Sequence, residues 1–144
     1  MLSTPLPSRR LLIADDHHDG ADILAMWLGF KGFDVRVAYD GDAAIKIANS
    51  FEPEALILDF DMPKCGGIQV ARQLRALAQH KFKLFIALTG RCEQNDLDEA
   101  ATVPFDAFLV KPCRMDSLLE ILNVAGIRNR AKSLEPDPGA VVDK

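Results

Sequence analysis

One stretch near the middle of the chain constrains the fold more than any other. Leu56, Ile57 and Leu58 run directly into Asp59, and Pro63 interrupts regular structure four positions later. A short, continuous apolar run bounded by a breaker is typical of a strand buried on both faces of a parallel sheet. Such a strand would deliver Asp59 to its carboxyl end, the edge at which open α/β sheets bind ligands. A carboxylate buried there needs partners, because burying it alone is costly.

Length and charge exclude several classes of protein. The 144 residues suit one domain with a single substantial core, and the net charge of -4 argues against a nucleic-acid partner. The apolar runs are too short to cross a bilayer, and the N-terminus lacks a signal-peptide core. The three cysteines show no Cys-x-x-Cys spacing, which indicates reduced thiols. We therefore expect a cytoplasmic protein that contacts neither nucleic acid nor membrane.

Four further segments have strand patterns, over residues 9–14, 34–38, 84–88 and 107–110. Helical patterns begin at residue 19 and at Gly67, and cover residues 42–49, 94–101 and 116–124. Strands that alternate with helices predict right-handed crossovers and a parallel sheet covered on both faces. The expected fold is α/β, with a doubly wound five-stranded sheet in the order 2-1-3-4-5.

The folded domain is expected to cover residues 9–126. Residues 1–8 contain two prolines and predict a flexible N-terminal arm. Residues 127–144 are mostly polar and contain Pro136 and Pro138, which predicts a disordered C-terminal tail.

Three conspicuous features are expected to have ordinary structural roles. Trp27 lies on a helix that is apolar nearly all round, so we expect it to pack in the core. The His17-His18 pair lacks the spacing of metal ligands and is expected in a solvated loop. Cys113 is expected to be a half-buried structural thiol.

The predicted strand order brings polar side chains together at one sheet edge. Strands one and three are neighbours in that order, so Asp15, Asp16 and Asp59 would converge there. Thr89 and Lys111 would approach from strands four and five.

Three neighbouring carboxylates repel one another, and a divalent cation relieves the repulsion. Oxygen ligands of this kind suit Mg²⁺, with Mn²⁺ as the alternative. Lys111 and Thr89 would bind phosphoryl oxygens, and Asp59 would act as the nucleophile. The predicted chemistry is phosphoryl transfer to Asp59.

The chain resembles the receiver domain of two-component response regulators, which has a flavodoxin-like fold. The resemblance runs from about residue 11 to residue 122. It is carried by motifs that follow apolar strands in the family's order: Asp15-Asp16, Asp59 with Asp61-Met62-Pro63 and Gly67, Thr89-Gly90, and Lys111-Pro112.

The resemblance implies a role for each of these residues. Asp59 would be the phosphoacceptor. Asp16 would bind Mg²⁺ directly and Asp15 chiefly through water. Asp61 would contribute its backbone carbonyl to the metal.

The resemblance also implies a switch. Thr89 would move toward the phosphoryl group, and the ring of Phe108 would change rotamer with it. Lys111 would contact the phosphoryl oxygens, and the peptide bond before Pro112 would be cis.

The function implied is that of a phosphoacceptor signalling module in a two-component phosphorelay. It would take a phosphoryl group from a phosphohistidine on a histidine kinase or histidine phosphotransfer protein, and then control a downstream protein. It would not be a turnover enzyme, beyond its own phosphorylation and dephosphorylation. Because the tail is too short for an output domain, we expect a stand-alone regulator or a receiver of a hybrid kinase. Met1 favours a whole protein.

Two other classes of protein fit part of the sequence. Asp59-Phe60-Asp61 fits the Asp-x-Asp motif of haloacid-dehalogenase-like phosphatases, which also form an aspartyl phosphate. That family carries the motif on its first strand, whereas here it follows the third. A flavodoxin-like cofactor binder is the other alternative, but the first loop lacks a Gly/Ser/Thr-rich phosphate cradle.

Overall fold

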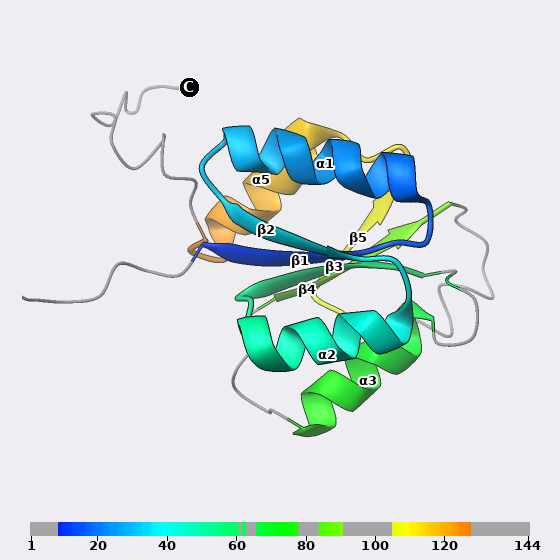
Figure 1. Cartoon of the computed structure of the whole chain (residues 1–144). Helices are drawn as coiled ribbons and strands as arrows, with labels where there is room; N and C mark the ends of the chain where they lie inside the picture. Colours follow the sequence, from blue (N-terminus) through cyan, green and yellow to red (C-terminus); the bar gives the residue numbers. More distant parts are fainter. Residues whose placement is uncertain (1–8, 61, 63–65, 78–83, 91–104, 128–144) are drawn as a thin grey trace, which may run out of the picture.

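The computed structural model describes residues 9–60, 62, 66–77, 84–90 and 105–127. Five strands form one parallel sheet in the order β2-β1-β3-β4-β5, which confirms the predicted fold class (Figure 1). The strands are β1 (Arg10–Ala14), β2 (Asp34–Ala38), β3 (Ala55–Asp59), β4 (Leu84–Thr89) and β5 (Ala107–Val110). The helices within the described residues are α1 (His18–Phe30), α2 (Gly41–Phe51), α3 (Gly67–Leu77) and α5 (Met115–Val124).

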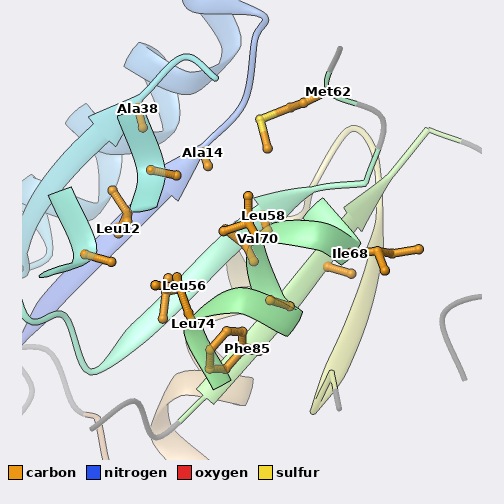
Figure 2. Packing of buried hydrophobic residues seen from close by; sticks show 14 of the residues in the cluster. Leu12, Ala14, Ala38, Leu56, Leu58, Met62, Ile68, Val70, Leu74 and Phe85 are labelled. Carbon is orange, nitrogen blue, oxygen red and sulfur yellow. The ribbon is translucent and has the colours of Figure 1, made fainter. Parts of the chain in front are cut away.

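Helices cover the sheet on both faces and make two separate apolar cores. Helices α1 and α5 lie on one face, and α2 and α3 lie on the other (Figure 1). Because successive side chains of a strand point to opposite faces, neighbouring residues enter different cores. Leu56 and Leu58 pack toward α2 and α3 (Figure 2), whereas Ile57 packs toward α1 and α5.

The central strand β3 is buried along its whole length, including Asp59 at its end. This matches the continuous apolar run from which its position was predicted. The edge strand β2 has alternating exposure, as its alternating sequence predicted.

The prediction that Trp27 packs in the core is wrong. Ala21 and Leu28 are the buried residues of α1, whereas Trp27 is 51% exposed and therefore is not a core residue. Ile23 and Phe30, which share the helical spacing of Trp27, are exposed too. The helix is apolar nearly all round, so periodicity alone could not tell its inner face from its outer face.

The element ends follow local capping chemistry. Asp40 caps α2, because its Oδ1 accepts a hydrogen bond from the Ala43 N–H at 2.8 Å. After α5, Ile127 is buried, and its N–H donates to the Leu122 carbonyl at 2.8 Å. The packed structure thus includes one residue past the predicted boundary at 126. The predicted arm at 1–8, the predicted helix at 94–101, and residues 128–144 of the tail predicted at 127–144 lie outside the described residues.

No helix in the part of the chain that the structure describes has the length and apolar character needed to span a membrane.

Asp106, just before β5, joins three elements at the amino-terminal edge of the sheet. Its Oδ2 accepts hydrogen bonds from the buried Phe85 N–H at 2.7 Å and from Arg75 Nη2 at 3.0 Å. The Asp106 N–H donates in turn to the Phe85 carbonyl at 2.8 Å. The Arg75 guanidinium also lies 4.1 Å from the centre of the Phe85 ring. The side chain of Asp106 therefore links α3, β4 and the start of β5.

We expect Asp106→Ala to lower the free energy of unfolding by about 2 kcal/mol, because it removes a charged acceptor from a buried N–H. Urea denaturation measures the change. Asp116→Ala is the control, since Asp116 is exposed and its Oδ2 lies 3.8 Å from Arg114 Nη2, a long separation for an ion pair. This substitution should lower the free energy of unfolding by less than about 1 kcal/mol. Equal losses in the two variants would contradict a special role for Asp106.

Candidate functional site

Two carboxylates meet at the carboxyl edge of the sheet because β1 and β3 are neighbours. The two strands pair in parallel, with Ala14 opposite Leu58, so the residues that follow them emerge side by side. Asp15 is 5% exposed and Asp59 is 3% exposed. Two buried carboxylates at the ends of neighbouring strands need a positively charged partner.

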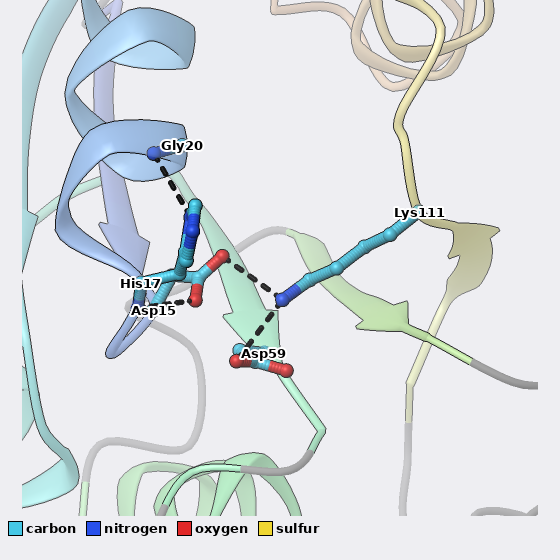
Figure 3. A network of polar contacts seen from close by, with 5 residues as sticks. All are labelled: Asp15, His17, Gly20, Asp59 and Lys111. Carbon is cyan, nitrogen blue, oxygen red and sulfur yellow. Dashed lines mark hydrogen bonds and ion pairs between the residues drawn. The ribbon is translucent and has the colours of Figure 1, made fainter.

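That partner is Lys111, which follows β5. Its Nζ lies 3.1 Å from Asp15 Oδ2 and 3.1 Å from Asp59 Oδ2 (Figure 3). Burial alone would lower the pKa of Lys111, but hydrogen bonds to Asp15 and Asp59 and the attraction of their charges outweigh it, so the pKa is raised. The ammonium therefore stays protonated at neutral pH and screens the two acids from each other.

Asp15 is held by a second contact. Its Oδ1 accepts the His17 N–H at 2.9 Å, so both carboxylate oxygens have protein partners. His17 is the N-cap of α1, because its ring Nδ1 accepts a hydrogen bond from the Gly20 N–H at 3.1 Å (Figure 3). The sequence predicts only a solvated loop here and does not predict the cap, because histidine is not among the usual N-cap residues.

His18, the first residue of α1, also has an ordered contact. Its ring stacks on Tyr39 with centroids 3.9 Å apart. The Tyr39 hydroxyl donates to Asp22 Oδ1 at 2.5 Å, and this hydrogen bond raises the pKa of Tyr39. The stack ties the start of α1 to the end of β2. The contact depends on the tertiary fold and has no local sequence signal.

Asp16 completes a group of acids that could hold a metal ion. One oxygen each from Asp15, Asp16 and Asp59 lies within 4.8 Å of the others. Three hard oxygen donors, one of them on the exposed Asp16, fit a cation such as Mg²⁺ that keeps part of its water shell. The donor set thus fits the metal that the sequence suggested.

The remaining predicted residues lie at the end of β4, within or just after β5, or outside the described part of the chain. Thr89 ends β4, is 5% exposed, and accepts the Lys111 N–H through its carbonyl at 2.8 Å. Phe108 on β5 is 42% exposed and packs edge-on against Phe105, with ring centroids 5.7 Å apart. The Lys111–Pro112 peptide bond is cis. Asp61 lies outside the described residues.

Gly67, the first residue of α3, lets that helix approach the backbone of Asp59. A Cβ at Gly67 would lie 2.6 Å from the Asp59 carbonyl oxygen and 3.1 Å from its carbon. No side chain fits that space without moving the backbone that carries Asp59.

A groove of about 710 Å³ adjoins the site. Asp15 and Lys111 form part of its wall, and the exposed side chain of Trp27 lines it from α1. Cys113 is also in the wall, and burial raises the pKa of its thiol, which keeps it protonated and unreactive. The groove was not predicted from the sequence, because Trp27 was expected in the core.

This fold and this edge define a class of protein. A doubly wound sheet whose central strand ends at an aspartate, paired with a lysine from the last strand, is the architecture of a receiver domain. Residues 11–123 match the response regulator receiver domain family, so the chain belongs to that family. Receiver domains are signalling modules rather than classical enzymes, and phosphorylation on aspartate is a general property of the family.

Relatives and solved structures agree with that assignment. The chain is 31% identical over 131 residues to response regulator MprA of Mycolicibacterium vanbaalenii, and 32% identical over 133 residues to that of Mycobacterium ulcerans. These matches cover 91% and 92% of this chain but 54% and 55% of the relatives, so the chain spans about half their length.

Two solved structures have the same fold. Chemotaxis protein CheY4 of Vibrio cholerae matches with a TM-score of 0.76 and 26% identity, over 83% of this chain and 99% of that one. A CheY-like receiver domain from Methylobacillus flagellatus matches with a TM-score of 0.73 and 30% identity, with the same coverage.

We expect Gly67→Ala to lower the free energy of unfolding by about 1–3 kcal/mol, because the new methyl group collides with the Asp59 backbone. Gly29→Ala is the matched control, since nothing lies within 4 Å of a Cβ there. That change should be neutral or stabilising by up to about 1 kcal/mol. Chemical denaturation of both variants measures the difference. If Gly67→Ala were as stable as the wild type, the close approach of α3 to the Asp59 backbone would not require glycine.

Proposed function

We propose that the chain is the phosphoacceptor module of a two-component phosphorelay, with Asp59 as the residue that receives the phosphoryl group. The observation that carries the proposal is the position of Lys111 Nζ, 3.1 Å from Asp59 Oδ2 at the carboxyl edge of the sheet. A nucleophilic carboxylate with a fixed cation beside it suits an incoming group that brings negative charge.

In the proposed transfer, an Asp59 carboxylate oxygen forms a bond to phosphorus as the bond between phosphorus and the donor's nitrogen breaks. The electron pair of that bond leaves with the ring, which departs as neutral imidazole because its other nitrogen carries a proton. Lys111 exchanges its contact with Asp59 Oδ2 for a contact with a phosphoryl oxygen, and its raised pKa keeps it charged meanwhile. Thr89, at the end of the neighbouring strand, supplies a hydroxyl to another phosphoryl oxygen.

Asp16, Asp15 and Asp59 would hold Mg²⁺, together with the backbone carbonyl of Asp61. Both oxygens of Asp15 already have protein partners, which supports a water-mediated role for Asp15 and direct ligation by Asp16. When bound, the metal supplies positive charge that neutralises the acids and the phosphoryl oxygens.

The proposed donor is a phosphohistidine on a histidine kinase or a histidine phosphotransfer protein, and the proposed output is a change in how a downstream protein is bound. Phosphorylation would shift the population of two conformations, with Thr89 and Phe108 as the switch residues. The exposure of Phe108 supports this role, because an exposed ring can change rotamer without unpacking a core. We place this activity in the cytoplasm, without direct contact to nucleic acid or membrane.

We expect acetyl phosphate with Mg²⁺ to add one phosphoryl group to the wild-type chain, detected by intact mass spectrometry. Asp59→Asn should abolish the mass increase, because an amide cannot form the acyl phosphate. Asp116→Asn, at an exposed acid on α5, should leave it unchanged. Equal phosphorylation of Asp59→Asn and the wild type would refute the proposal.

We also expect Mg²⁺ to stabilise the wild-type chain, because the ion binds the folded acids only. At ten times its dissociation constant the gain is about 1.4 kcal/mol, visible as a higher midpoint in thermal unfolding. Asp16→Asn should lose most of this gain, whereas Asp42→Asn, at an exposed acid on α2, should retain it. A Mg²⁺-dependent gain that is equal in all three proteins would place the ion elsewhere.

A further inference from the structure

Asp16 is the least supported of the three acids that could hold a metal ion. The carboxylate of Asp15 is fixed by Lys111 and by the His17 N–H, and Lys111 also fixes Asp59 (Figure 3). Asp16 is exposed, and its side chain makes no hydrogen bond or ion pair with another described residue. Its oxygen nevertheless lies within 4.8 Å of an oxygen of each of the other two acids. That position must therefore be set by the backbone that carries Asp16.

The backbone around Asp16 is held on both sides by two consecutive residues at the end of β2. Before Asp16, the Asp15 N–H donates to the Ala38 carbonyl at 3.0 Å. After it, the ring of His18 stacks on Tyr39, with centroids 3.9 Å apart and an interplanar angle of 17°. Ala38 and Tyr39 thus hold the residue before Asp16 and the second residue after it.

The ring of Tyr39 is itself fixed, so it can fix the loop. Its hydroxyl donates to Asp22 Oδ1 at 2.5 Å, and Asp22 lies four residues after His18 on the same side of α1. The tyrosine therefore contacts the first turn of the helix at two points. Strand β2, which ends just before Tyr39, pairs with β1 along its whole length. The His17 ring, by contrast, caps α1 and joins it to no other element.

We propose that Tyr39 is a positioning residue for Mg²⁺. Through the stacked ring of His18, it holds the backbone of Asp16 where that carboxylate joins the other two acids. The inference rests on the magnesium site of the proposed function. Neither ring is a ligand; the pair acts by holding a ligand in place before the ion arrives. A ligand held in this way loses less conformational freedom when the ion binds, which raises the affinity.

The test measures the dissociation constant of Mg²⁺ by isothermal titration calorimetry, with the unphosphorylated chain. Tyr39→Ala removes the stack, and we expect the dissociation constant to rise about five-fold, less than for a group bonded directly to a ligand. Tyr39→Phe keeps the ring and loses only the hydroxyl, so its dissociation constant should stay within about two-fold of the wild type. An equal loss in both variants would assign the effect to the hydroxyl and overturn the role of the stack.

A double-mutant cycle tests whether the two rings act as one unit. His18→Ala should weaken Mg²⁺ binding to about the same extent as Tyr39→Ala, because either substitution removes the same stack. The double variant should bind no more weakly than either single variant. If the two losses multiply instead, the rings act independently and the inference fails. His18 is exposed, so His18→Ala also decides the question if Tyr39→Ala does not fold.

Two measurements distinguish positioning from a general loss of structure. Asp106→Ala removes a contact at the opposite edge of the sheet, so it should lower the stability and leave the dissociation constant of Mg²⁺ unchanged. In Tyr39→Ala, saturating Mg²⁺ should restore the wild-type rate of phosphorylation by acetyl phosphate, because every ligand is still present. A rate that stays low at saturation would place the effect on Lys111 or Asp59 and overturn the inference.

The outcomes separate this inference from the proposed function. If the wild-type chain binds Mg²⁺ and Tyr39→Ala binds it equally tightly, the positioning role is wrong and the magnesium site stands. If the wild-type chain does not bind Mg²⁺, the magnesium site of the proposed function fails, and the positioning role fails with it.

Discussion

The ammonium group of Lys111, shared between Asp15 and Asp59, is the interaction on which this molecule depends. Both acids are almost fully buried, and each needs a partner where β1 and β3 end. The lysine follows β5 and reaches Asp59 of β3 across the end of β4. Its long, unbranched side chain also places Nζ 3.1 Å from Asp15, which follows β1. A shorter or neutral residue at position 111 would leave two buried negative charges facing each other.

The rest of the architecture holds that contact in place. Two independent apolar cores press on opposite faces of the sheet, so the strands that carry Asp15 and Asp59 are fixed from both sides. Gly67 brings α3 against the backbone of Asp59 itself. On the side toward α1 and the start of α5, a groove adjoins Asp15 and Lys111.

The sequence predicts most of this arrangement, because its strongest signals are local. Apolar runs that end at Asp15, Asp59, Thr89 and Lys111 predicted four of the five strands. The strand order common to doubly wound sheets then predicted the shared edge. The same reasoning failed for Trp27, since an apolar residue on a helix that is apolar all round has no periodic signal for its direction. It also missed the His17 cap and the Asp106 contact. The His17 cap is a local contact, but histidine is not among the usual N-cap residues, whereas Asp106 meets Phe85 only after β4 and β5 have paired.

The site is assembled from three parts of the chain that are far apart in sequence, so an incompletely folded chain cannot form it. Asp15, Asp59 and Lys111 become neighbours only when β1, β3 and β5 occupy one finished sheet. A fragment, or a copy caught half-folded, has the acids but no lysine between them. Under the proposed function, Asp59 could therefore accept a phosphoryl group only in the completely folded chain. An incompletely folded copy would stay unphosphorylated and so would not act on a downstream protein.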